Sequence, residues 1–114
     1  MIARAHLSHL GTSDQKTRLV VNEIRGKAVG EALSTLRFMK KAVARDLEKL
    51  LRSAVANAEQ RQQRLDVDRL FVSRAWVDRG PAQGRIRHRA MGRVFRVLKR
   101  SCHVTLELDV RGQA

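Results

Sequence analysis

Arginine side chains recur at spacings of two and four residues in one short segment of the chain, at Arg85, Arg87, Arg89 and Arg93. Planar guanidinium groups form paired hydrogen bonds with phosphate oxygens and stack on nucleobases. In an extended segment, the first three of these side chains project to one side. The chemistry that this pattern favours is the binding of a polyanion, and RNA offers both phosphates and unpaired base faces.

The arginines lie within a longer stretch that has no carboxylates. Residues 79–106 contain eight Lys or Arg and no Asp or Glu, so they carry +8 of the chain's net charge of +13. Like charges at this density repel each other, and an anionic partner is needed to offset the repulsion. A membrane is the weaker candidate for that partner, because no apolar run approaches the roughly 18–20 residues of a membrane span.

Catalytic and metal chemistry find little support in the sequence. Cys102 is the only cysteine, which excludes an internal disulfide and favours a reducing compartment. None of the histidines has the spacing of a zinc ligand set with a second cysteine. Asp66 and Asp68 could hold a divalent ion, but two carboxylates before a strand are more often solvated. We therefore expect no enzyme, no cofactor and no metal.

The elements that must position the arginines begin with a short, mixed segment, Ile2 to Leu10, which is interpreted as an edge strand. A helix is predicted in "GTSDQKTRLVVNEIRGK". Thr12 or Ser13 can serve as its N-cap, Thr12 and Gln15 fit a capping box, and a glycine suits its C-cap. Its predicted apolar stripe is Leu19, Val20 and Ile24.

Two more helices are predicted from apolar spacings of three and four residues. The second spans "VGEALSTLRF", and its predicted inward residues are Val29, Ala32, Leu33 and Leu36. The third runs from Ala42 to about Gln62, with its inward face formed by Val43, Leu47, Leu50, Leu51, Ala54, Val55 and Ala58.

Two strands then flank the cationic stretch. The first lies in "LDVDRLFVSRAWVDRG", and the second alternates apolar and polar residues from Cys102 to Val110, which predicts one buried and one wet face. The connector between them is too long for a tight turn, so it is interpreted as a hairpin that extends beyond the body. Each arm of about 11 residues would reach roughly 35 Å at about 3.3 Å per residue.

Three segments, "SDQKTRLVVNEIRGK", "LLRSAVANAEQ" and "VDRGPAQGRIRHRAMGRVFRVLKRSCHVTLEL", together resemble the ribosomal protein L-twenty-two family of the bacterial large subunit. The resemblance covers roughly residues 3–110. It implies an α+β fold, with three helices packed on a small three-stranded antiparallel sheet and a long protruding β-hairpin. The chain would be one domain, 1–114, with a globular body at about 1–78 and 101–112 and the basic hairpin at about 79–100.

The resemblance also implies a structural, non-enzymatic constituent of the large ribosomal subunit that binds 23S-type rRNA and supports its assembly. The residues expected to contact rRNA are Lys16, Arg18, Arg25, Lys27, Arg79, Arg85, Arg87, His88, Arg89, Arg93, Arg96, Lys99 and Arg100. The hairpin tip is expected to line the nascent-peptide exit tunnel through Arg87, His88, Arg89, Ala90, Met91 and Gly92. Expected partners are large-subunit rRNA, neighbouring ribosomal proteins and the nascent polypeptide, in the cytoplasm, without a membrane or a homo-oligomer.

Several positions depart from the family pattern. Gly84 and Met91 stand where the family has lysines, which removes two candidate phosphate contacts, and His88 replaces a proline. Asp14 replaces the proline of a Ser-Pro pair at the start of the first helix, where the helix dipole favours a carboxylate.

The alternative function is a stand-alone basic β-ribbon that binds DNA in a groove as an architectural protein. Comparable affinity for duplex DNA and folded rRNA would favour that alternative. The sequence weighs against it, because the arm lacks an apolar tip for intercalation and the body shows no seam for a dimer.

Overall fold

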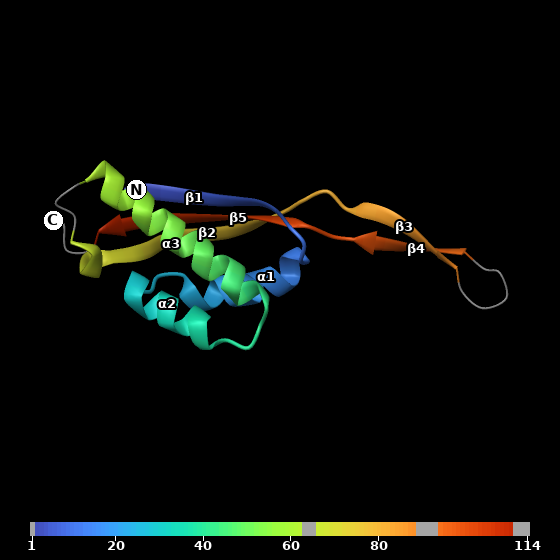
Figure 1. Ribbon diagram of the computed structural model, residues 1–114, viewed down its shortest axis with the longest axis horizontal. Coiled ribbons are helices and arrows are strands. Elements are labelled where there is room, and N and C mark those ends of the chain that lie inside the picture. Colours follow the sequence, from blue (N-terminus) through green and yellow to red (C-terminus); the bar gives the residue numbers. More distant parts are fainter. Residues whose placement is uncertain (1, 63–65, 89–93, 111–114) are drawn as a thin grey trace.

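The computed structural model describes residues 2–62, 66–88 and 94–110, and in 83–88 and 94–99 it describes the backbone alone. The chain forms an α+β fold in which three helices lie against one face of a three-stranded antiparallel sheet (Figure 1). This confirms the fold class predicted from the sequence. The elements are β1 Ala3–Leu10, α1 Asp14–Ile24, α2 Val29–Phe38, α3 Val43–Arg61, a 3-10 turn Val67–Arg69, β2 Leu70–Arg79, β3 Gln83–His88, β4 Val94–Lys99 and β5 Cys102–Val110.

Strand β5 is the central strand of the sheet, with β1 and β2 antiparallel on either side. The register places Ala5, Leu106 and Ala75 in one row across the sheet. The inner face of β5 packs against the helices, and its apolar residues Cys102, Val104, Leu106 and Leu108 are fully buried. Each large apolar side chain removed from water in this way contributes about 1.5–3 kcal/mol.

The second and third helices agree closely with the sequence prediction. Helix α2 has the predicted bounds, and α3 begins and ends within one residue of them. On α3, Leu47, Leu51 and Ala54 are fully buried, while Val55 is only partly buried against the core. The apolar spacing was therefore sufficient to place both helices.

The first helix differs from the prediction in two details. Its N-cap is Ser13, whose side chain accepts a hydrogen bond from the backbone N–H of Lys16, so the predicted capping box starting at Thr12 is wrong. Leu19 is 57% exposed, whereas Val21 is fully buried. The inclusion of Leu19 in the predicted stripe is wrong, because Val20 and Val21 lie four and three residues before Ile24 on one face of the helix, whereas Leu19 lies five residues before it.

The outer strands of the sheet each have one edge whose backbone groups lack a neighbouring strand. On β2, the N–H of Gly26 donates to the carbonyl of Val72 at 2.9 Å, and the N–H of Val72 donates to the carbonyl of Lys27 at 3.0 Å. Gly26 makes this possible with a φ of 81°, a left-handed conformation that glycine adopts without strain. The segment after α1 therefore covers part of the β2 edge.

The edge of β1 is covered by side chains from α3. The amide of Asn57 donates to the carbonyl of Arg4 at 3.1 Å, and the guanidinium of Arg61 donates to the carbonyl of Ile2 at 3.3 Å. Because both sheet edges are occupied from within the body, the sheet does not offer an open edge at these positions for pairing with another chain.

Strands β3 and β4 form a separate two-stranded antiparallel pair that points away from the body (Figure 1). Their register runs from Gln83 opposite Lys99 to His88 opposite Val94. The longest dimension of the molecule is 66 Å, against 25 and 20 Å for the other two. Residues 89–93, which include most of the predicted tip 87–92, lie outside the described residues.

Candidate nucleic-acid interface

The paired arms place several of the predicted RNA-contacting residues on two adjacent strands. Arg85 and Arg87 lie on β3, opposite Val97 and Phe95, and Arg96 lies on β4 opposite Ile86. The remaining arm residues are placed on the same two strands, with His88 at the end of β3 and Lys99 at the end of β4. The other predicted tip residues, Arg89, Ala90, Met91 and Gly92, and the predicted rRNA contact Arg93 lie outside the described residues.

The arms join the body at a closely packed base. The N–H of Gly80 donates to the carbonyl of Ser101 at 3.0 Å, and the hydroxyl of Ser101 donates to the carbonyl of Pro81 at 2.7 Å. A Cβ atom at position 80 would lie 2.6 Å from the Ser101 hydroxyl oxygen, so glycine allows the close approach. Arg79 and Arg100 line a small cavity of about 150 Å³ at this base, which brings two predicted RNA contacts together.

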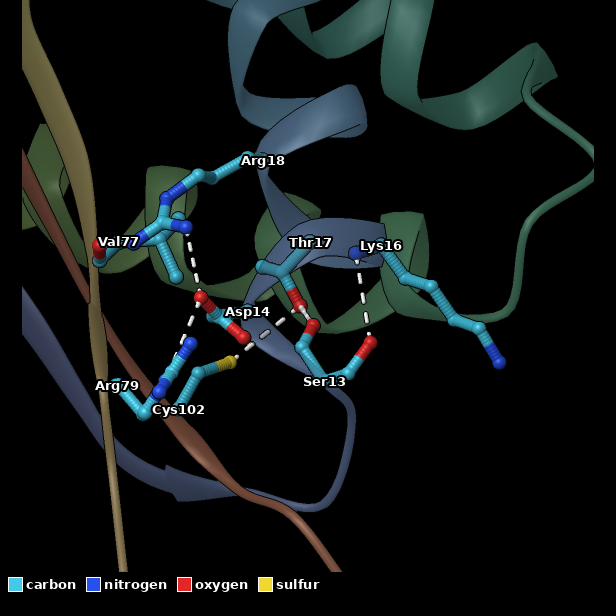
Figure 2. A network of polar contacts seen from close by, with 8 residues as sticks. All are labelled: Ser13, Asp14, Lys16, Thr17, Arg18, Val77, Arg79 and Cys102. Atoms are coloured by element: carbon cyan, nitrogen blue, oxygen red, sulfur yellow. Dashed lines mark hydrogen bonds and ion pairs between the residues drawn. The ribbon is translucent and has the colours of Figure 1, made fainter.

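Asp14 lies beside the base of the arms and forms ion pairs with two arginines (Figure 2). Its carboxylate accepts a hydrogen bond from Arg18 at 2.7 Å and lies 3.9 Å from Arg79, although its own side chain is only 4% exposed. Burial alone would raise the pKa of Asp14, but the charges of Arg18 and Arg79 and its hydrogen bonds outweigh that effect. The pKa of Asp14 is therefore lower than its ordinary value of 3.8.

The role of Asp14 as a partner for two arginines was not predicted from the sequence. One signal was present, since Asp14 and Arg18 are four residues apart on a helix, a spacing that favours an ion pair. The approach of Arg79 depends on how α1 packs against β2, which no local spacing encodes. Asp14 thus ties the start of α1 to the end of β2, where the arms begin.

Two of the predicted rRNA-contacting side chains around α1 form hydrogen bonds with the backbone of β2, and two do not. The guanidinium of Arg25 donates twice to the carbonyl of Ala75, at 2.7 and 3.1 Å, and Arg18 donates to the carbonyl of Val77 at 3.0 Å. These two arginines cover the β2 edge that the backbone of the α1–α2 connection leaves open. The side chain of Lys16 is exposed, and Lys27 is half-buried.

Replacing Arg25 with Ala is expected to lower the free energy of unfolding by about 1–2 kcal/mol, because two hydrogen bonds from a charged donor to Ala75 are lost. Urea denaturation followed by circular dichroism measures the change. Lys16→Ala is the matched control, since Lys16 lies exposed on the same helix and only its backbone N–H is bonded. Equal stability of the two variants would show that Arg25 does not hold the edge.

The outer face of the sheet carries a cluster of polar and aromatic side chains. The prediction that this face of β5 is exposed to water is therefore wrong. Thr105 and Glu107 are only 4% and 5% exposed, because side chains of β1 and β2 lean over the central strand. Arg4 pairs with Glu107, and its guanidinium lies 5.9 Å from the ring centre of Trp76. Trp76 therefore packs on this face.

Three histidines also meet on this face, which their positions in the sequence did not indicate. The rings of His6 and His9 lie 6.0 and 4.9 Å from the ring of His103, measured between centres. Two of the ring nitrogens already have partners, since His6 Nδ1 is bonded to Thr105 and His103 Nδ1 accepts from the N–H of His9. Within residues 2–62, 66–88 and 94–110, no group of His, Cys, Asp or Glu is arranged to hold a metal ion.

Cys102 lies in the core, where its sulfur is 3.3 Å from the hydroxyl oxygen of Thr17 (Figure 2). A thiol reagent is therefore expected to leave Cys102 unmodified in native buffer and to modify it fully after unfolding in urea, because only unfolding exposes the sulfur. Intact mass spectrometry after timed labelling gives the readout. Rapid labelling of the folded protein would show instead that the Cys102 sulfur is accessible and reactive.

A basic α+β body with two paired cationic arms has the charge distribution that favours binding to a nucleic acid. The sequence matches the family model of ribosomal protein L22p/L17e over residues 5–109. The chain therefore belongs to the ribosomal protein L22p/L17e family, whose members are structural proteins and not enzymes.

Bacterial relatives are similar over nearly the whole chain. The large ribosomal subunit protein uL22 of Anaeromyxobacter sp. (strain K) is 52% identical over 104 residues, which cover 91% of this chain and 71% of the relative. The protein of the same name from Geobacter metallireducens is 50% identical over 108 residues, covering 95% and 97%. That of Solibacter usitatus is 44% identical over 108 residues, covering 95% and 96%.

Among the described helices, none is long and apolar enough to cross a membrane.

Proposed function

We propose that this chain is a structural constituent of the large ribosomal subunit in the bacterial cytoplasm, where it binds 23S-type rRNA and supports assembly of the subunit. The observation that carries the proposal is the acid-free segment 79–106, four of whose eight cations lie on the two strands that extend from the body. Such an arm has few apolar neighbours of its own, and an isolated two-stranded ribbon is marginally stable in water. Folded RNA supplies both the phosphates and the surrounding surface that the arm lacks.

The finer part of the proposal concerns what the arms reach. In the bound state the end of the arms, residues 87–92, helps to line the exit tunnel and meets the nascent polypeptide, while the body contacts rRNA and neighbouring ribosomal proteins. Support comes from family membership and from the direction of the arms, which point away from the body along the longest axis of the molecule. Arg79 and Arg100, at the base of the arms, would meet RNA where the arms enter it.

Sedimentation of a native lysate on a sucrose gradient, before and after a high-salt wash, tests the proposal. The chain is expected to remain in the large-subunit peak after the wash, because arms enclosed by rRNA are not released by screening alone. A surface-bound protein loses its phosphate contacts steeply as salt rises. Release of the chain into the top fractions, or its co-sedimentation with chromosomal DNA, would contradict the proposal and favour a groove-binding DNA protein.

A further inference from the structure

The connection between α2 and α3 exposes an aromatic ring that the fold does not use. Phe38, the last residue of α2, is 83% exposed, and Leu19 on α1 is the other large apolar side chain with high exposure in the described part of the chain. The core is otherwise well sealed, since the large apolar residues of α3 and β5 are fully buried. A ring left in water at a helix end is therefore a surface available for a partner.

The same connection carries unpaired positive charge. Residues 32–45 contain four cations and no carboxylate: Arg37, Lys40, Lys41 and Arg45. All four are exposed, and none forms an ion pair with the residues that the structure describes. Arg18, Arg25, Arg52 and Arg61 differ, because each of them has a protein partner. The cations of the α2–α3 connection thus remain free to meet an external anion.

A cavity adjoins this connection and brings in a further cation from α1. Lys16 and Lys41 both line a surface cavity of about 410 Å³ together with Thr12, Ala42 and Val43. In Figure 1 the connection leaves α2, runs along the border of the helical layer away from the sheet and returns to α3 beside α1. Two lysines beside one cavity favour an anionic occupant, because each carries a positive charge.

We propose that Phe38, Lys16 and Lys41, with Arg37 and Lys40, form a second RNA-binding surface on the body, which stacks an unpaired base on Phe38 and holds adjacent phosphates at the cavity. Phe38 and Lys41 are three positions apart in the sequence, so the chain keeps their Cα atoms within about 11 Å of each other. A single RNA strand can therefore contact both. Base stacking on aromatic rings accepts any base, and lysines bind phosphate as point charges.

This surface rests on the proposed function, since it assumes that the partner is rRNA. Its α1 residue, Lys16, points away from Val77 and Arg79 at the end of β2 (Figure 2). An acidic protein segment could satisfy the lysines, yet it would not account for an exposed ring beside them as well as a base does. Duplex DNA keeps its base faces stacked inside the helix and has no free face for Phe38. An RNA with unpaired bases fits both features.

The test compares the binding of purified full-length variants to deproteinised bacterial 23S rRNA by filter retention over a salt series. Phe38→Leu, which keeps an apolar side chain but removes the ring, is expected to weaken binding by roughly 5- to 100-fold, in line with the measured worth of one stacked base. Phe38→Trp is expected to restore it. Lys41→Gln is expected to lower the slope of log affinity against log salt by about 0.7–0.9.

Two controls make the result interpretable. Leu19→Ala changes the other exposed apolar residue and should leave affinity unchanged, and thermal melts should show equal stability for all the variants because the changed side chains are exposed. Ultraviolet cross-linking of the wild-type complex, followed by mass spectrometry, should yield a nucleotide attached to the peptide that contains Phe38.

Failure of this inference can be told apart from failure of the proposed function. If Phe38→Leu binds rRNA like the wild type while removal of the arms abolishes binding, the second surface is overturned and the proposed function stands. If neither change affects binding, both are overturned. If Phe38→Leu leaves rRNA affinity intact and Phe38 cross-links to a neighbouring protein in assembled subunits, the surface is a protein-docking site and the RNA proposal is wrong.

Discussion

A chain in which residues 82–99 are replaced by Asn-Gly is expected to keep the fold of its body and to lose most of its affinity for large-subunit rRNA. Asn-Gly is a favoured two-residue hairpin turn, and Pro81 and Arg100 are already brought together at the base of the arms by the bonds of Gly80 and Ser101. The replaced segment pairs with itself and not with the three-stranded sheet. Its removal therefore leaves the core intact.

The loss of affinity follows from the charge that is removed. Residues 82–99 contain six cations: Arg85, Arg87, Arg89, Arg93, Arg96 and Lys99. If each neutralises one phosphate, the slope of log affinity against log salt should fall by about 4–5, at about 0.7–0.9 for each contact. Filter retention with deproteinised 23S rRNA over a salt series gives this slope, and circular dichroism with thermal melting reports on the body.

A second variant separates the charge of the arms from their shape. Changing the same six residues to Gln keeps the length of the segment and removes its charge. The slope of log affinity against log salt should therefore fall by nearly as much as in the Asn-Gly variant. If this variant binds like the wild type, shape and not charge holds the arms to RNA. Global unfolding of the Asn-Gly variant would instead show that the arms are part of the folding unit, against the division into body and hairpin.

Elements with a strong periodic pattern could be predicted from the sequence. The prediction for helix α2 matches its observed bounds, and the alternation from Cys102 to Val110 correctly predicts a strand there. Both succeed because local spacing determines which face of a helix or strand is apolar, and the burial of that face then drives packing. The acid-free stretch identified the candidate interface for a similar reason, since charge excess is a property of composition and needs no tertiary information.

Features that depend on how elements pack could not be predicted. Glu107 lies in the polar phase of its strand yet is nearly inaccessible, because Arg4 from the neighbouring strand covers it. The meeting of three histidines likewise depends on strand register. Spacing within one element contains no information about its neighbours.

Asp14→Asn is expected to lower the melting temperature at neutral pH more than any exposed single-charge substitution. An amide is neutral and cannot offset the charges of Arg18 and Arg79, while the site remains closed to water, since the Asp14 side chain is only 4% exposed. Part of the loss should persist in high salt, because the carboxylate itself is nearly inaccessible to ions, although Arg18 and Arg79 are 47% and 73% exposed. Glu59→Gln is the matched control, since Glu59 is exposed on α3 and forms no ion pair with the described residues.

The pH dependence gives this prediction a definite sign. The pKa of Asp14 in the folded protein lies below its ordinary value of 3.8, so its carboxylate stabilises the fold at every pH above that value. As the pH falls through the lower, folded pKa, the carboxylate takes up a proton and the stabilisation disappears. The melting temperatures of wild type and Asp14→Asn should therefore differ by a constant amount from neutral pH down to about pH 5 and converge below pH 4.

Thermal melts between pH 2.5 and pH 8, at low and high salt, measure this difference directly. A gap between the two proteins that is constant over the whole range would show that Asp14 acts through its shape or hydrogen bonds and not through its charge. Because Asp14 joins the start of α1 to Arg79, a true charge effect also means that the anchor of the arms is electrostatic. In Asp14→Asn the arms should then be held less firmly to the body, so the affinity for rRNA should fall. The slope of log affinity against log salt should stay unchanged, because the number of phosphate contacts is the same.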